Sequence, residues 1–164
     1  MSSYAGNYLV FGVVNADYSS LRPSATPRFP GSFPDGMSQT ALFVEKYAVS
    51  KIPADAIGTG KGYAGGCQWA YFQGDCNAPL FAYHYPLLKR TDPGALGPTS
   101  AADPRDSRFQ VQPPAERCHP CLPSTAHNSM NACMADGSVR ALDRGMSRPA
   151  WWALVTPAGG DVSE

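Results

Sequence analysis

The chain has 164 residues, of which 13 are lysine or arginine and 13 are aspartate or glutamate, so its formal net charge is zero. This length is enough for one domain, residues 1–164, to bury a hydrophobic core, and the zero charge gives no electrostatic attraction to nucleic acid or anionic membranes. A hydrophobic fraction of 43% excludes general disorder, whereas 16 glycines and 16 prolines predict many long loops.

No stretch approaches the roughly 18 consecutive apolar residues of a membrane-spanning helix, so we expect no membrane span in this chain. The N-terminus also lacks the basic residues and following apolar run of a secretion signal. We therefore interpret the chain as a processed or truncated product, or as one to which Met1 has been added.

The N-terminal part predicts a strand followed by an irregular segment. Residues 4–14 are rich in β-forming side chains such as Tyr8 and Val10, which favours a strand. Residues 15–36 contain four prolines, a density that excludes regular structure. We expect this second segment to cross the surface of the domain.

Residues 39–49 admit two interpretations. Asp35 and Ser38 could cap a helix, but the apolar and β-branched side chains that follow suit a strand. We favour a central strand, whose alternate side chains face opposite sides of a sheet. One face then carries Ala41, Phe43, Glu45 and Tyr47, and the other carries Leu42, Val44, Lys46 and Ala48.

The middle of the chain alternates predicted loops with short strands. Residues 54–66 contain five glycines and are expected to form a mobile loop. Residues 67–73 and 80–86 are interpreted as two strands around Gly74-Asp75, and residues 91–106 as another Pro/Gly loop. A short strand at residues 108–112 should end at Pro113-Pro114.

Near the C-terminus, two apolar runs at 130–135 and 138–142 flank Asp136-Gly137. Asp-Gly suits the positive φ angles of a two-residue type I′ turn, so we expect a β-hairpin here.

A short helix is predicted over residues 147–155. Ser147 is a good N-cap and Pro149 suits the first turn of a helix. Trp151, Trp152 and Val155 then share one helical face, which either packs on the sheet or forms an exposed aromatic patch for a neighbouring subunit.

The segment 124–142 carries a motif, His127 followed after eight residues by Asp136-Gly137-Ser138-Val139-Arg140. This motif resembles the C-terminal signature of a planctomycete-type prepilin-like family, in which nine residues usually separate the histidine from Asp-Gly. Similar blocks occur in the same order at residues 3–8, 33–47 and 109–113 and at Trp151-Trp152, so the resemblance covers most of the chain.

The resemblance implies a pilin-like or pseudopilin-like globular domain of the α+β class, mostly antiparallel β with long loops. Family precursors begin with a prepilin leader and a long apolar helix, which this sequence does not contain. The family has no assigned biochemical function.

The five cysteines suggest disulfides. Cys67 and Cys76 bracket a short segment around a predicted turn, and a secreted product would be oxidised, so we expect them to be linked. Cys118, Cys121 and Cys133 allow three pairings. The resemblance favours Cys118 with Cys133, because family members often have cysteines at such positions.

Metal binding is the rival interpretation of these residues. Cys118 and Cys121 have the spacing of half a zinc site, and His127 and Cys133 follow, but no second paired motif completes the ligand set. Calcium could bind Asp136 and loop carbonyls, although the sequence has no dense run of oxygen ligands. We therefore expect no metal and no other cofactor.

His127 is interpreted as a structural residue at the start of the hairpin. Its only acidic partner nearby in the sequence is Asp136, and no nucleophile, zinc-protease or phosphate-loop motif occurs. We therefore expect that the protein is not an enzyme and has no catalytic residues.

These observations, together with the resemblance, predict a structural protein of the cell envelope or an extracellular assembly, located outside the cell or on its surface. Its partners would be copies of itself, in an oligomer or filament. The alternative is a secreted small-ligand or glycan-binding module that uses the aromatic-rich segments 69–72 and 83–85.

Overall fold

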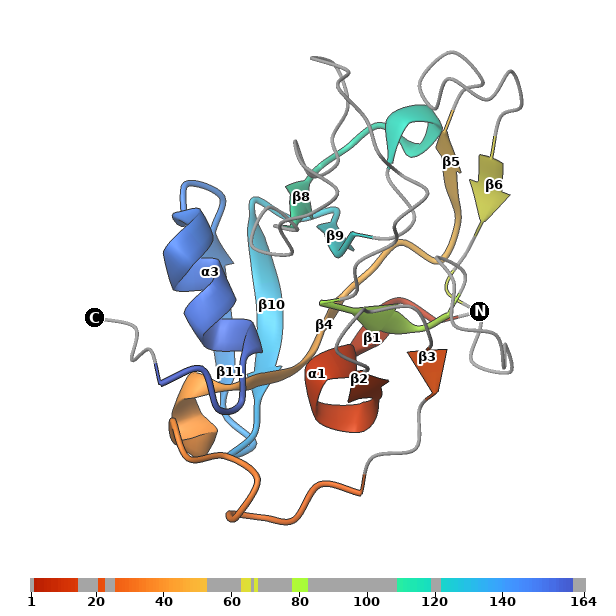
Figure 1. Cartoon of the computed structure of the whole chain (residues 1–164). Coiled ribbons are helices and arrows are strands. Elements are labelled where there is room, and N and C mark those ends of the chain that lie inside the picture. Colours follow the sequence, from red (N-terminus) through yellow and green to blue (C-terminus); the bar gives the residue numbers. More distant parts are fainter. Residues whose placement is uncertain are drawn as a thin grey trace.

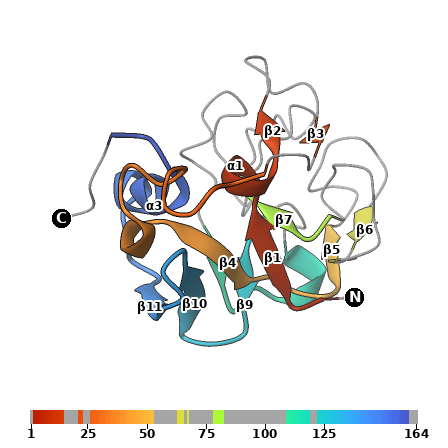
Figure 2. The same ribbon diagram turned by 90° about the horizontal axis from the view of Figure 1, so that it is seen from below.

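The computed structural model describes residues 2–14, 21–22, 26–52, 63–65, 67, 78–82, 109–118 and 122–160. Its centre is a five-stranded sheet in the order β11-β10-β4-β1-β7 (Figures 1 and 2). The strands are β1 (Tyr4–Asn7), β4 (Ala41–Glu45), β7 (Leu80–Phe81), β10 (Ser129–Met134) and β11 (Val139–Asp143). All neighbours are antiparallel except β1 and β7, so the expected α+β class with a mostly antiparallel sheet is confirmed.

Shorter elements surround the sheet. They are α1 (Tyr8–Phe11), β2 (Val13–Val14) paired with β3 (Leu21–Arg22), η1 (Met37–Gln39), β5 (Ser50–Ile52) paired with β6 (Tyr63–Gly65), β8 (Gln110–Val111) paired with β9 (Ser124–Thr125), η4 (Ala115–Arg117) and α3 (Arg148–Val155). No helix within the described ranges is long and apolar enough to cross a membrane.

The central strand is confirmed. Val44 of β4 lies opposite Ala5 of β1 and Ala132 of β10, so β4 is hydrogen-bonded on both edges. The possible helix near this segment is limited to η1, which ends before β4 begins. β4 thus supplies the surface on which the rest of the domain packs.

The single strand expected over residues 4–14 is interrupted. β1 ends at Asn7, whose side-chain oxygen accepts a hydrogen bond from Leu9 N at 2.9 Å and so caps α1. The chain returns to β structure only after Gly12, where a Cβ atom would overlap the ring of Tyr8. Local capping by the asparagine side chain therefore overrides the β propensity of this run.

Asn7 also joins three elements. It is fully buried, and its Nδ2 atom donates to Ala41 O of β4 at 2.8 Å and to Val155 O at the end of α3 at 2.7 Å. One amide side chain therefore connects the N-terminal strand to the central strand and to the C-terminal helix.

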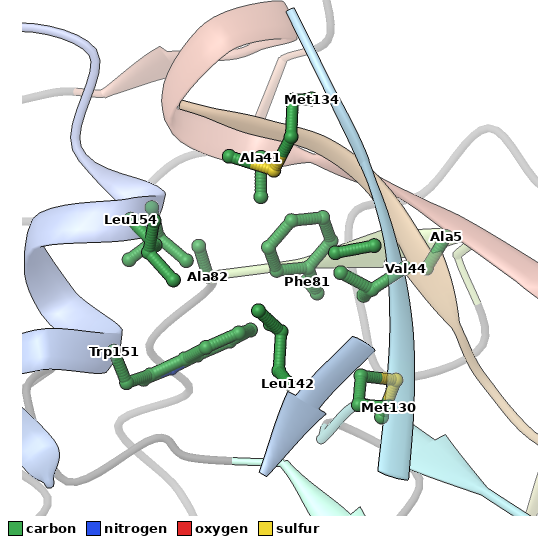
Figure 3. Close-up of a cluster of buried hydrophobic side chains, with 12 residues drawn as sticks. Ala5, Ala41, Val44, Phe81, Ala82, Met130, Met134, Leu142, Trp151 and Leu154 are labelled. Carbon is green, nitrogen blue, oxygen red and sulfur yellow. The ribbon is translucent and has the colours of Figure 1, made fainter. Parts of the chain in front are cut away.

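The main core lies between the sheet and α3 (Figure 3). Alternate residues of β10 are fully buried, and they meet side chains of β4 and α3. Trp151 is 0% exposed, and its ring centroid lies 5.9 Å from that of Phe81 and 5.2 Å from that of Phe109. These aromatic contacts fix the helix on the sheet.

The C-terminal helix is confirmed, with Ser147 as N-cap accepting from Ala150 N at 3.2 Å. The exposed aromatic patch is wrong for Trp151, because this indole is part of the core. Trp152 is half-buried and packs against the edge of the same core.

The C-terminal hairpin is confirmed, but its turn is not of type I′. Gly137 N donates to Met134 O at 3.0 Å, and Met134 N donates to Ser138 O at 2.8 Å. Gly137 has a φ of 85°, whereas Asp136 does not have the positive φ that a type I′ turn requires. The loop is a three-residue connection that ends in a left-handed glycine, because Ala135 joins the turn instead of extending β10.

The remaining predicted elements are only partly described. β8 confirms a short strand within residues 108–112, and β7 forms the first two residues of the strand expected at 80–86. The predicted strand at 67–73 beyond Cys67, and the loop expected at 91–106, lie outside the described residues.

Candidate functional site

A surface pocket with a volume of about 360 Å³ lies where β4 leaves the sheet. Three segments line it, residues 3–4 before and within β1, residues 45–49 at and beyond the end of β4, and residues 124–127 of β9 and the following bend. These segments are far apart in the sequence, so the pocket exists only because β4 passes between β1 and β10.

The carboxylate of Glu45 forms the floor of this pocket. Its Oε2 atom accepts from the Thr125 hydroxyl at 2.6 Å and from Asn131 N at 3.2 Å. Its Oε1 atom accepts from Asn131 Nδ2 at 3.2 Å and lies 3.4 Å from His127 Nε2. The side chain is 12% exposed, and these four donors use the acceptor capacity of the carboxylate.

His127 lies in the bend that leads into β10, as expected for a residue at the start of the hairpin. Its backbone N–H donates to the Thr125 hydroxyl oxygen at 3.1 Å, and its imidazole is 65% exposed above Glu45. Asp136, the only acidic residue near His127 in the sequence, lies at the other end of β10. β10 separates the two residues, and six residues at about 3.3 Å each place them about 20 Å apart.

The next residue of the chain, Lys46, also lines the pocket but is almost fully buried. It is 3% exposed, and its ammonium donates to Ala78 O at 2.9 Å and to Leu80 O at 3.1 Å. These bonds connect the end of β4 to β7, which lies on the other side of β1. The positive charge is thus directed at backbone carbonyls and away from solvent.

Two buried thiols flank this lysine. Burial raises the pKa of Cys67 and of Cys118, and the nearby Lys46 ammonium opposes this effect at both. A hydrogen bond with Ser124 also opposes it at Cys118. Burial, followed by the proximity of Cys118, raises the pKa of the Tyr47 hydroxyl. These groups are therefore neutral at physiological pH.

The geometry does not reproduce a catalytic triad. In a triad, the imidazole accepts a proton from the nucleophilic hydroxyl, and the carboxylate binds the opposite side of the ring. Here the imidazole and the Thr125 hydroxyl both use Glu45 as their acceptor. The arrangement joins β4 to the bend before β10, and it supplies no route for a proton from hydroxyl to histidine.

The zinc ligands considered from the sequence are not brought together. Within the described part of the chain, no three His, Cys, Asp or Glu side chains are close enough to share a metal ion. Cys118 packs near Gln110, His127 contacts Glu45, and Cys133 lies within β10. Cys121 lies outside the described residues.

Asp136, the calcium candidate, is a turn residue. Its Oδ1 atom accepts from Ser138 N at 2.9 Å and from the Ser138 hydroxyl at 2.6 Å. These hydrogen bonds hold the pKa of the exposed Asp136 carboxyl below its usual range. The carboxylate therefore stabilises the turn that precedes β11.

The expected disulfide between Cys118 and Cys133 is not formed, because Cys67, Cys118 and Cys133 are free thiols in the structure. Cys76 lies outside the described residues, so its link to Cys67 stays a prediction. The Cys67 thiol donates to Tyr4 O at 3.2 Å, and the Cys133 thiol donates to Met134 O at 3.6 Å. Cys118 and Cys133 stay apart because one follows η4 beside β8, whereas the other is held within β10.

The sequence did not indicate Glu45 as the residue that organises this pocket. The one sequence feature that could have indicated Glu45 is its place at the end of the central strand β4. A correct prediction of the register between β4 and β10 would have placed it beside Asn131. The aromatic segments considered for glycan binding, 69–72 and 83–85, lie outside the described residues. Comparison with protein-family models, with curated proteins and with solved structures finds no match to this chain.

Proposed function

We propose that this chain is a non-enzymatic structural protein of the cell envelope or of an extracellular assembly. Its globular domain would be pilin-like or pseudopilin-like and would work by binding further copies of itself. The observation that carries the proposal is the edge strand β11, which ends the central sheet.

Within the described residues, β11 is an edge strand with an unpaired side that could pair with a strand of another molecule. It pairs with β10 along one side, and no strand in the described part of the chain pairs with its other side (Figure 2). Only Leu142 of its five residues is buried, and Val139 is 69% exposed, the highest value among the exposed large hydrophobic residues. A free edge of this kind can accept a strand from a second molecule through backbone hydrogen bonds.

Two further properties support this proposal. First, the carboxylate of Glu45 accepts hydrogen bonds from Asn131 of β10 and from Thr125. These bonds join β4 to β10, which supports a structural role for Glu45. The zero net charge of the chain leaves long-range repulsion between copies weak, which permits close packing of subunits.

Negative-stain microscopy and sedimentation velocity of the purified protein test the proposal. We expect filaments or concentration-dependent oligomers for the unchanged chain. Val139→Lys should give folded monomers, because a charge on an edge strand opposes the pairing of edges. Ala115→Lys, which adds the same charge at an exposed position of η4, should leave assembly unchanged.

A protein that stays monomeric at every concentration would contradict the proposal. Equal assembly of the Val139→Lys variant and the unchanged chain would show that β11 is not the contact. Trp152→Ala then tests the second candidate surface, since this indole is half-buried on α3.

A further inference from the structure

We propose that the pocket above Glu45 binds a neutral, hydroxyl-rich ligand, such as one saccharide residue. The pocket is formed by β1, the segment after β4 and the bend before β10, and it does not include the edge strand β11. Its volume of about 360 Å³ lies in the lower part of the range of small-molecule sites.

The charges at the pocket exclude a strongly ionic ligand. Glu45 accepts hydrogen bonds from Thr125 and Asn131 and contacts His127, so its oxygens are occupied and cannot coordinate an ammonium group. The ammonium of Lys46 is 3% exposed and is directed at the carbonyls of Ala78 and Leu80. Both charges are therefore already satisfied within the protein, which favours a ligand that binds through neutral hydrogen bonds and apolar contact.

The rim of the pocket supplies the apolar contact. Tyr4 is 53% exposed and Val49 is 49% exposed, and both are among the few exposed large hydrophobic residues of the described chain. An exposed tyrosine ring offers a flat apolar surface for the C–H face of a sugar ring, and its hydroxyl can hydrogen-bond. Two exposed apolar side chains at one pocket favour a ligand with an apolar face.

The polar groups beside this rim are held in place before any ligand binds. Because Nε2 of His127 faces Glu45, its Nδ1 atom is left to hydrogen-bond a ligand hydroxyl. The Tyr47 hydroxyl lies 3.4 Å from Thr125 O, to which it donates, and its oxygen can still accept. A binding site whose polar groups are fixed in this way loses little entropy on binding.

Amide NMR titrations test the proposal. The ligands are glucose, galactose, mannose and N-acetylglucosamine, and the charged comparisons are inorganic phosphate and methylammonium, each added to millimolar concentration. We expect at least one sugar to cause saturable shifts of the Thr125 and His127 amides. Tyr4→Ala should weaken this binding about tenfold, the upper effect of losing one aromatic contact, whereas Tyr4→Phe should retain most of it.

Val139→Ala is the matched control, because it removes an exposed apolar side chain on β11, outside the pocket. It should leave the sugar titration unchanged, and Tyr4→Ala should leave assembly unchanged, so this proposal and the assembly role can fail separately. The absence of saturable shifts with all four sugars would overturn the proposal. Shifts of the pocket amides with phosphate or methylammonium alone would overturn the ligand class.

Discussion

Replacing Asn7 tests the fold most directly, because this buried side chain makes three hydrogen bonds to other parts of the backbone. It accepts from Leu9 N at 2.9 Å and donates to Ala41 O at 2.8 Å and Val155 O at 2.7 Å. Asn7→Ala leaves these three groups without their partner. At about 1–2 kcal/mol for each, the loss is roughly 3–6 kcal/mol, a large part of the 5–15 kcal/mol that stabilises an average domain.

Urea unfolding followed by circular dichroism measures this loss. Asn7→Asp keeps the oxygen that caps α1 but removes both donors, so it should be at least as destabilising as the alanine variant. Asn128→Ala is the control, because this asparagine is exposed in the bend before β10 and its loss should cost less than about 0.5 kcal/mol. A cost below about 1 kcal/mol for Asn7→Ala would refute the assignment of Asn7 as the connection between β1, β4 and α3.

Three further predictions concern the turn, the pocket floor and the buried thiols. Gly137→Val should lower the free energy of unfolding in urea by about 1 kcal/mol or more, because its φ of 85° is costly for a β-branched residue. Glu45→Gln should cost about 1–3 kcal/mol in the same assay, because one acceptor oxygen becomes a donor that faces other donors. Thermal stability should fall as the pH rises above 9.0, the usual pKa of a thiol. Burial raises the pKa of Cys67 and Cys118 in the folded chain, so above this pH their thiols ionise more readily in the unfolded chain, which is thereby stabilised.

Each of these predictions has its own control. Gly137→Asn should cost less than the valine variant, since asparagine tolerates the left-handed conformation and a Cβ atom at this position meets no other atom within 4 Å. Glu116→Gln makes the same replacement at an exposed position of η4, and it should leave the free energy of unfolding unchanged. The alkaline loss of stability should become smaller in Cys118→Ala; an unchanged profile in this variant would remove the thiol from the explanation.

The elements that sequence reasoning placed correctly have strong local signals. The C-terminal hairpin is marked by Asp136-Gly137 between apolar runs, and α3 is marked by Ser147 and Pro149 at its start. The turn type was wrong because local sequence does not show whether Ala135 belongs to the strand or to the loop. That choice is made by pairing, as Ala135 N donates to Thr40 O at 2.8 Å, outside the hairpin.

The pocket could not be predicted, because its contacts join residues that are 80 to 86 positions apart. A glutamate at the end of a strand usually faces water, and only the alignment of β4 with β10 places Glu45 beside Asn131. The same limit applies to Trp151 and Trp152, since the helix pattern alone does not show which indole faces the sheet. The expected link between Cys118 and Cys133 is absent for a related reason, as Cys118 follows η4 and lies near Gln110 of β8, whereas Cys133 lies within β10.

The positions of His127 and Asp136-Gly137 explain how a one-residue difference in their spacing can be accommodated. His127, which precedes β10, contacts Glu45, whereas Asp136-Gly137 forms the turn that follows β10. A residue added within β10 would reverse its alternation and move Met130, Ala132 and Met134 out of the core, where all three are 0% exposed. The bend at 126–128 is exposed and carries no such constraint. A residue added in this bend would therefore leave the hairpin and the core intact, and it would change only the approach of the histidine to Glu45.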